Sequence, residues 1–340
     1  MSRKLIALVA GLAVLTAFAA AASARTNDDK IVGAGSSFVF PLVSQWIPAV
    51  GPDLGINLTY ASIGSGGGIA QITARTVDFG ASDAPLSPDQ FAACKGCVQI
   101  PWALAATAVM YNLPGIGKQL RLTGPVIANI YLGKIKQWDD AAIKKLNPGR
   151  NLPSLKITPV YRSDNSGTSY NFTDYLSSVS GEWKSKIGVG VNANWPAGVG
   201  GKGSSGVSGV IVNTQGAIGY ADTAYALKNK IQIASVQNRA GVFAQAGTRG
   251  TIAAAATVTK VPGSNELHIV NPQKSQKLAY PIATFTYVIL PTKTDKAPAL
   301  RKLVFWALTK GQTFGPKLLF VPIPKKVLAA SEKTLKRVQS

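Results

Sequence analysis

Short β-branched or apolar segments alternate with amphipathic segments along most of this chain, and the alternation limits the folds it can adopt. Residues 56–63 (INLTYASI), 77–81 and 98–112 have the composition of strands, although Pro101 interrupts the last one. Between them, residues 69–74 and the segment that opens with Ser87 and Pro88 have helical patterns. Later strands are expected at 157–162, 217–220 and 284–290, and later helices from Pro125, after Thr168 and over 300–308. Strands that alternate with helices predict an α/β fold with mostly parallel strands.

The connections between these segments bear on domain organisation. A chain of 340 residues is long enough for about two domains, each with its own core. We find no repeat of solenoid length and no low-complexity linker, so two domains would be joined by crossing strands. Residues 188–209 are rich in Gly, Ser and Asn, and we expect a surface loop there before another helix.

The N-terminus has the order of a secretory signal peptide. Arg3 and Lys4 precede an apolar run from Leu5 to about Ala20, and the small residues Ala22-Ser23-Ala24 follow. The alternative is a transmembrane anchor, but the run is near the short end for a span. We therefore expect residues 1–24 to be removed after Ala24 and the protein to be periplasmic or secreted.

Cysteine and histidine are scarce, which narrows the chemistry. His268 is the only histidine, so a His-based metal site is excluded, and we expect neither a metal nor a cofactor. Cys94 and Cys97 have C-x-x-C spacing, which in a cytosolic protein would suggest a thioredoxin-like dithiol. In an exported protein, a structural disulfide without a catalytic role is favoured.

The charge balance is strongly positive. Lys and Arg number 36 against 15 Asp and Glu, a formal net charge of +21. Such a field favours nucleic acid, an anionic membrane or a small anion as partner. The lysines are spread along the chain, with modest density at the C-terminus, rather than interleaved with aromatic residues as in nucleic-acid binders. We interpret most of them as a solvated face and expect no nucleic-acid partner.

Glycine-rich segments do not complete a known nucleotide motif. The segment Gly33–Phe38 begins like a dinucleotide fingerprint, but Phe38 stands where the third glycine is required. Gly200–Gly203 lacks the hydroxyl residue and the earlier glycine of a phosphate-binding P-loop. No G-x-S-x-G elbow is present, and one histidine makes a Ser–His relay improbable.

Three turns of small residues each precede a predicted helix: Gly35-Ser36-Ser37-Phe38, Gly64-Ser65-Gly66-Gly67-Gly68 and Ser166-Gly167-Thr168-Ser169. A helix N-terminus has unpaired N–H groups and the positive end of the helix dipole, so it attracts anions. Ordinary N-capping explains any one such turn. Three of them, together with Arg162 in an exported cationic protein, favour oxyanion binding.

The same turns belong to six ordered blocks that resemble the phosphate-binding proteins of the high-affinity ABC phosphate importer. The resemblance extends over residues 30–320. The blocks are Gly33–Phe38, Ser62–Gly67, Val77–Ser87, Ile130–Ile135 with Trp138-Asp139-Asp140, Arg162–Ser169 and Gly216–Tyr220. Ser37 stands where some relatives have threonine, and Asn165 where others have glycine. The C-x-x-C pair and the high basicity are not explained by the resemblance.

The resemblance implies an α/β, two-lobed periplasmic-binding-protein fold with a ligand cleft between the lobes. The lobes would be residues 25–102 with 283–340, and residues 103–282, joined by two crossing hinge strands that close on the ligand. It implies that inorganic phosphate is bound by Ser37, Phe38 (through its N–H), Ser65, Asp83, Arg162, Ser166, Gly167 and Thr168. It also implies that Asp164 orients Arg162.

The implied function is binding of phosphate and its delivery to the permease subunits of an ABC transporter in the inner membrane, by a monomer that is not an enzyme. Asp83 is informative, because a carboxylate beside an anion is costly unless the ligand donates a proton to it. Phosphate carries such a proton near neutral pH and sulfate does not. Two other readings stay open. One is a secreted phosphatase with a serine nucleophile, although no general base is evident. The other is a basic secreted protein of adhesion or signalling that binds phosphate incidentally.

Overall fold

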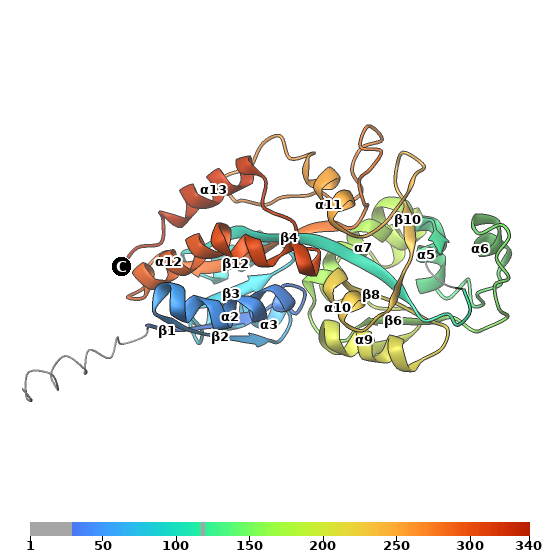
Figure 1. The fold of residues 1–340 in the computed structure, drawn as a ribbon, viewed down its shortest axis with the longest axis horizontal. Helices are drawn as coiled ribbons and strands as arrows, with labels where there is room; N and C mark the ends of the chain where they lie inside the picture. The colour runs from blue at the N-terminus through green and yellow to red at the C-terminus, as the bar shows by residue number, and fades with distance from the viewer. Residues whose placement is uncertain (1–28, 117–119) are drawn as a thin grey trace, which may run out of the picture.

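A mixed β-sheet runs through the length of the molecule, with helices on both of its faces (Figure 1). The computed structural model describes residues 29–116 and 120–340, so the signal peptide predicted at residues 1–24 lies outside the described residues. The sheet order is β2-β1-β3-β12-β4-β8-β6-β7, with β9 also paired to β4. Its strands are β1 Asp29–Gly35, β2 Ile56–Ser62, β3 Phe79–Ser82, β4 Cys97–Tyr111, β6 Thr158–Arg162, β7 Val199–Gly201, β8 Ala217–Asp222, β9 Gln232–Ile233 and β12 Ala283–Pro291.

The helices and a second, three-stranded sheet complete the described chain. The small sheet consists of β5 Arg121–Leu122, β10 Ser235–Gln237 and β11 Phe243–Ala244. The α-helices are α2 Phe40–Leu54, α3 Ser65–Thr73, α4 Pro88–Ala93, α5 Gly124–Tyr131, α6 Ala141–Leu146, α7 Gly167–Val179, α8 Gly181–Lys186, α9 Gly203–Asn213, α10 Thr223–Lys228, α11 Thr248–Ala255, α12 Ala297–Leu308 and α13 Lys325–Leu335. Two short 3₁₀ helices, Lys310–Phe314 and Pro316–Leu318, follow α12. Among the described helices, none is both long and apolar enough to cross a membrane.

The prediction of an α/β fold is confirmed, but the prediction of mostly parallel strands is wrong. β1 is parallel to β2 and β3, and β6 is parallel to β7 and β8. The two central strands differ: β12 is antiparallel to β3 and β4, and β4 is antiparallel to β8. A strand pattern in sequence does not reveal strand direction, which depends on where the intervening segments return.

The strand β4 contributes to the two largest hydrophobic cores of the described chain, and all 15 of its residues are buried. Trp102 and Ala105 lie in a core formed with β1, α2 and α12, whereas Val109 and Tyr111 lie in a core formed with α5 and α7. The β12 register shifts beside Pro101, where Thr286 pairs with Ala103 and Tyr287 pairs with Pro101. A bulge suits this position because proline has no N–H to donate to the ladder. The lobe boundaries at residues 102/103 and 282/283 stay a prediction.

The prediction of a surface loop over residues 188–209 is wrong in its second half. β7 begins at Val199 and the helix α9 begins at Gly203. The glycines of α9 disfavour a helix, but its apolar residues Val207 and Ile211 are fully buried. Burial of this apolar face outweighs the weak intrinsic helix propensity of the segment. A β-carbon on Gly201 would come within 2.6 Å of the Val207 backbone nitrogen, so the close approach of β7 to α9 requires glycine there.

Cys94 and Cys97 are joined as a disulfide between the end of α4 and the start of β4. The Arg75 guanidinium covers the pair: its Nη1 lies 3.3 Å from both sulfurs, and its Nη2 donates to the Cys94 carbonyl at 2.7 Å. The bond therefore fixes the turn that leads into the central strand.

We expect the exported protein to contain no free thiol. Maleimide labelling in denaturant without a reductant should give no adduct, and labelling after reduction should give two. Denaturant is needed because both sulfurs are buried. Replacement of both cysteines by serine should lower the free energy of unfolding by about 2 kcal/mol, the value expected for so short a loop. Two reactive thiols in the unreduced sample would contradict the prediction.

Candidate functional site

The carboxyl group of Asp83 is the point at which three separate segments meet. The residue is 1% exposed and follows directly after β3. Ser36 Oγ donates to its Oδ1. Thr168 Oγ1 and Ser65 Oγ donate to Oδ2 at 3.2 Å and 3.5 Å. Residues more than a hundred positions apart in the sequence therefore share one buried acceptor.

The helices that supply these hydroxyls all begin at the site. Ser36 lies in the turn before α2, Ser65 is the first residue of α3, and Thr168 is in the first turn of α7. All three turns predicted to open helices do so in the structure. The N-terminal end of a helix is partially positive, so these three ends together create a region that favours negative charge.

Arg162 is the last residue of β6. Among the described residues it is the only cationic side chain that contacts this cluster. The side chain is 2% exposed, and it donates through Nε to Asp164 Oδ1 at 2.7 Å and through Nη2 to Oδ2 at 2.5 Å. The pairing with Asp164 leaves the Nη1 side of the guanidinium toward Thr168 Oγ1, at 3.4 Å. Asp164 also accepts a hydrogen bond from the Gly203 N–H at 3.0 Å, which ties α9 to the same group.

The remaining predicted ligand residues lie around the same cluster, and some of their polar groups form hydrogen bonds within the protein. The Phe38 N–H donates to Ser36 Oγ at 3.0 Å, while its ring packs edge-on against Phe320. Ser166 Oγ accepts from the Ser169 N–H at 3.1 Å and caps α7. A β-carbon on Gly167 would lie 2.6 Å from Ser65 Oγ and 2.7 Å from the Asp83 nitrogen. Only glycine allows α7 to approach α3 and β3 this closely.

Ser204 is a member of the site that the sequence patterns did not single out. It is fully buried at the start of α9, and its Oγ lies 3.0 Å from Ser37 Oγ and 3.5 Å from Arg162 Nη1. Its N–H donates to Ser37 Oγ at 3.0 Å. Assignment of residues 188–209 to a loop concealed it. The signal available in the sequence was Gly203-Ser204-Ser205-Gly206, a fourth small-residue turn of the same kind.

Two more residues support Asp83 without having been predicted. Ser36 is fully buried, and its Oγ donates to Asp83 and accepts from the Phe38 N–H. Asn171 lies one turn into α7 and donates to the Asp83 carbonyl at 2.9 Å. Ser36 adjoins the predicted Ser37, and the sequence does not reveal which of two neighbouring hydroxyls faces the carboxyl group.

Burial raises the pKa of Asp83 from an ordinary 3.8 to about 6. Loss of hydration disfavours the ionised carboxylate. Hydrogen bonds from Ser36, Thr168 and Ser65 and the positive charge of Arg162 act in the opposite direction. Asp83 is therefore mostly ionised near neutral pH, and it is an acceptor at the centre of a ring of donors.

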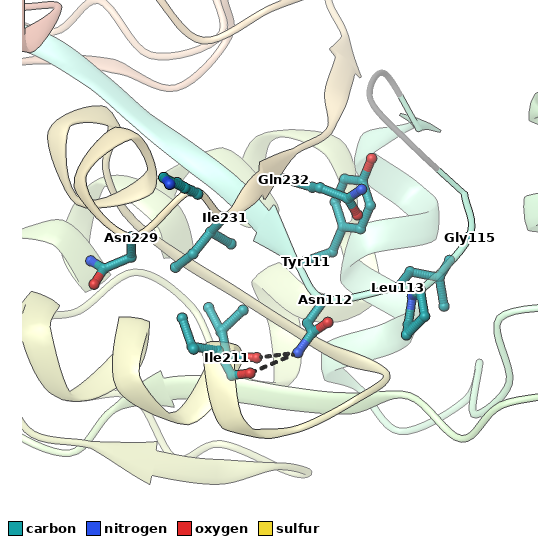
Figure 2. Close-up of a pocket in the computed structure, with 11 residues that line it drawn as sticks. Tyr111, Asn112, Leu113, Gly115, Ile211, Asn229, Ile231 and Gln232 are labelled. Atoms are coloured by element: carbon teal, nitrogen blue, oxygen red, sulfur yellow. Dashed lines mark hydrogen bonds between the residues drawn. The ribbon is translucent and has the colours of Figure 1, made fainter.

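A hollow exists elsewhere, beside Tyr111 at the C-terminal end of β4. It has a volume of about 260 Å³, and Figure 2 shows Tyr111, Asn112 and Ile211 among its lining residues. The Asn112 amide donates to the carbonyls of Ile211 and Val212 at 2.9 Å and 3.0 Å. None of the predicted ligand residues is among the described residues that line it, so the converging hydroxyls around Asp83 form the better candidate site. Within the described chain, no group of three or more His, Cys, Asp or Glu residues is placed to hold a metal ion.

Comparison with known proteins identifies the family to which this chain belongs. A family model described as a PBP superfamily domain matches residues 20–310. The phosphate-binding protein PstS of Xylella fastidiosa strain 9a5c is 44% identical over 314 residues, which cover 91% of this chain and 85% of that protein. PstS of Pasteurella multocida is 40% identical and covers 89% of each chain. The chain belongs to this family of phosphate-binding proteins. The resemblance deduced from the six sequence blocks is confirmed, and the family is one of solute-binding transport proteins.

Solved structures confirm the two-lobed periplasmic-binding-protein fold. A putative phosphate ABC transporter substrate-binding protein from Clostridium perfringens, determined with bound phosphate, has a TM-score of 0.63 at 18% identity. The match covers 87% of this chain and 100% of that one. A phosphate-binding protein from Stenotrophomonas maltophilia has a TM-score of 0.64 at 19% identity, and covers 89% of this chain and 93% of that one.

The raised pKa of Asp83 should be visible in the pH dependence of stability. Between about pH 4 and 6 the folded protein holds this proton and the unfolded chain does not. As pH rises through this interval, ionisation of Asp83 in the folded protein therefore lowers the free energy of unfolding, by roughly 3 kcal/mol in total. Asp83→Asn should remove this contribution. The difference in free energy of unfolding between variant and wild type, measured without phosphate, should shift in favour of the variant over this interval.

Asp89→Asn is the matched control, because Asp89 is exposed in the first turn of α4. A difference curve for Asp83→Asn that is as flat as the control would mean that the buried carboxyl titrates normally.

Proposed function

We propose that this protein binds inorganic phosphate at the cluster around Asp83 and delivers it to the permease of an ABC transporter. The observation that carries the proposal is a buried, ionised carboxyl group surrounded by hydroxyl donors, helix N-termini and one arginine. Membership of the phosphate-binding protein family supports it. Phosphate suits the cluster because it is an anion that also has a proton to donate.

The proposed contacts divide the phosphate oxygens among several donors. The predicted ligand set is Ser37, Phe38, Ser65, Asp83, Arg162, Ser166, Gly167 and Thr168. Arg162 retains N–H groups beyond the two that pair with Asp164, and guanidinium geometry matches phosphate oxygens. Asp164 holds the guanidinium in place, and the helix N-termini supply N–H groups without further free cations. Ser204 orients Ser37 and Arg162 from α9.

We infer that phosphate stabilises closure of the two lobes. In the predicted division, Ser37, Ser65 and Asp83 belong to residues 25–102 with 283–340, and Arg162 and Thr168 belong to residues 103–282. Two hydrogen bonds across that division support the inference about closure. One joins Thr168 to Asp83, and the other joins Ser204 to Ser37. A ligand that binds both groups at once favours the closed arrangement.

Membership of the family also supports a proposal for the cellular setting. We propose that the signal peptide is removed near Ala24 and that the protein works as a periplasmic monomer whose partner is the inner-membrane permease. We propose no catalytic activity, since the relatives in the comparison are named as binding proteins. An assay for phosphate-ester turnover tests this last point, and measurable hydrolysis by purified protein would refute it.

The function is tested by calorimetry of the purified protein with phosphate and with sulfate. At pH 7 we expect strong binding of phosphate and weak binding of sulfate, because ionised Asp83 accepts a hydrogen bond from the O–H of phosphate, whereas sulfate has no such proton and is repelled. As pH falls through about 6, protonation of Asp83 removes the repulsion, and sulfate binding should strengthen. Asp83→Asn should lower the phosphate-to-sulfate affinity ratio and abolish this pH dependence.

Asp89→Asn again serves as control and should keep the wild-type ratio. An unchanged ratio in Asp83→Asn would place selectivity elsewhere in the site, whereas no phosphate binding by the wild type would refute the function itself.

Replacement of the arginine tests the cation of the site. Arg162→Lys should weaken phosphate binding at least about tenfold, because an ammonium cannot reproduce the paired donors and one charge-assisted hydrogen bond contributes roughly 1.5–3 kcal/mol. Arg249→Lys, at an exposed position on α11, should bind as the wild type does. Wild-type affinity in Arg162→Lys would remove this arginine from the binding site.

A further inference from the structure

The positive charge of this protein is concentrated in the part of the chain that phosphate binding does not use. After Asp222 the only acidic residues are Glu266, Asp295 and Glu332, whereas lysines and arginines continue at close intervals to the C-terminus. The densest group lies on α13 and directly after it: Lys325, Lys326, Lys333, Lys336 and Arg337. All five are exposed.

The cations of α13 share one side of the helix. At about 3.6 residues per turn, Lys325, Lys326, Lys333 and the capping Lys336 fall within an arc of roughly 100°. Val327, Ser331 and Leu335 are buried on the opposite side against the protein. The cationic arc therefore faces solvent, and its only other member is Ala329.

These cations do not stabilise the fold in an obvious way. Among the described residues none of the five forms an ion pair, and Lys326 Nζ makes only a long contact of 3.5 Å with the Thr259 carbonyl. Lys325 and Lys326 lie in the first turn of α13, where the helix dipole disfavours positive charge, and no acidic residue is present there. Because these lysines are unfavourable for the stability of the helix, we interpret them as part of a surface that binds a partner.

Neighbouring loops extend the positive surface. The contact of Lys326 with Thr259 places Lys260 beside α13, and Lys260, Lys274 and Lys277 are all exposed. Figure 1 shows α13 and the loops near α11 along the same upper edge of the molecule. This edge, defined here by the cations of α13 together with Lys260, is called the basic edge.

We propose that the basic edge binds the anionic headgroups of a phospholipid membrane and holds the protein at the surface where its permease lies. The exposed arc offers charge but no aromatic or large apolar anchor, which protein interfaces and single-stranded nucleic acid sites use. Lysine clusters of this size are sufficient for headgroups, which require neither shape nor sequence. Because the apolar side of α13 is buried in the protein, the attraction is electrostatic and sensitive to salt.

The proposal is tested with the protein isolated after export and with vesicles, in the absence of phosphate. The wild type should co-sediment with vesicles of phosphatidylethanolamine and phosphatidylglycerol, release at high salt, and ignore vesicles of phosphatidylcholine alone. A triple variant with Lys325→Gln, Lys333→Gln and Lys336→Gln should partition at least about tenfold more weakly. Phosphate affinity of this variant should equal that of the wild type, which separates the inference from the proposed function.

The matched control carries Lys136→Gln, Lys145→Gln and Lys156→Gln. It removes the same net charge from exposed positions around α6, at the opposite end of the molecule from α13 (Figure 1). The control should retain binding to anionic vesicles. Equal loss in both variants would show that total charge alone matters, and absence of wild-type binding would refute the proposal. Binding that depends on α13 only when permease is present in phosphatidylcholine vesicles would assign the edge to a protein partner instead.

Discussion

The buried carboxyl group of Asp83 is the constraint around which the functional part of this molecule is arranged. A carboxylate that is 1% exposed loses most of its hydration, and the structure compensates with three hydroxyl donors and a nearby guanidinium. Those donors come from the starts of helices that are far apart in sequence. Satisfying one acceptor therefore requires α2, α3 and α7 to converge, and this convergence brings three helix N-termini together at one point.

The buried positive charge of Arg162 is compensated in the same way. Arg162 is almost fully buried, and Asp164 neutralises it with two short contacts while leaving one side of the guanidinium toward the site. The segments around this pair must approach closely. A β-carbon on Gly64 would lie 2.3 Å from Asp164 Oδ2, and one on Gly167 would collide with Ser65 and Asp83. The glycines of the signature turns therefore serve close packing as much as access to an anion.

The sheet determines how these groups reach one another. β4 and β12 run antiparallel through the centre, and β4 contributes to the two largest cores, so the two halves share strands and need no flexible linker. Hydroxyl contacts at the site then connect residues of both halves directly, from Thr168 to Asp83 and between Ser204 and Ser37. The basic edge along α13 lies on the core that contains Trp102, apart from these contacts. The proposed anion site and the densest group of positive side chains therefore lie in different parts of the molecule.

The sequence alone determined the α/β class, most element positions and the family, because periodicity, capping residues and ordered glycine blocks are local features. Through resemblance it also supplied two of the hydroxyl residues that meet at the Asp83 carboxyl group, Ser65 and Thr168. Strand direction, the helix α9 and the places of Ser36 and Ser204 were decided by tertiary structure. Gly203–Asn213 has too little intrinsic helix preference to be recognised, and it is helical because Val207 and Ile211 are buried against the sheet. Ser204 reaches Ser37 and Arg162 only because α9 packs beside β6 and β8, a contact that no local pattern encodes.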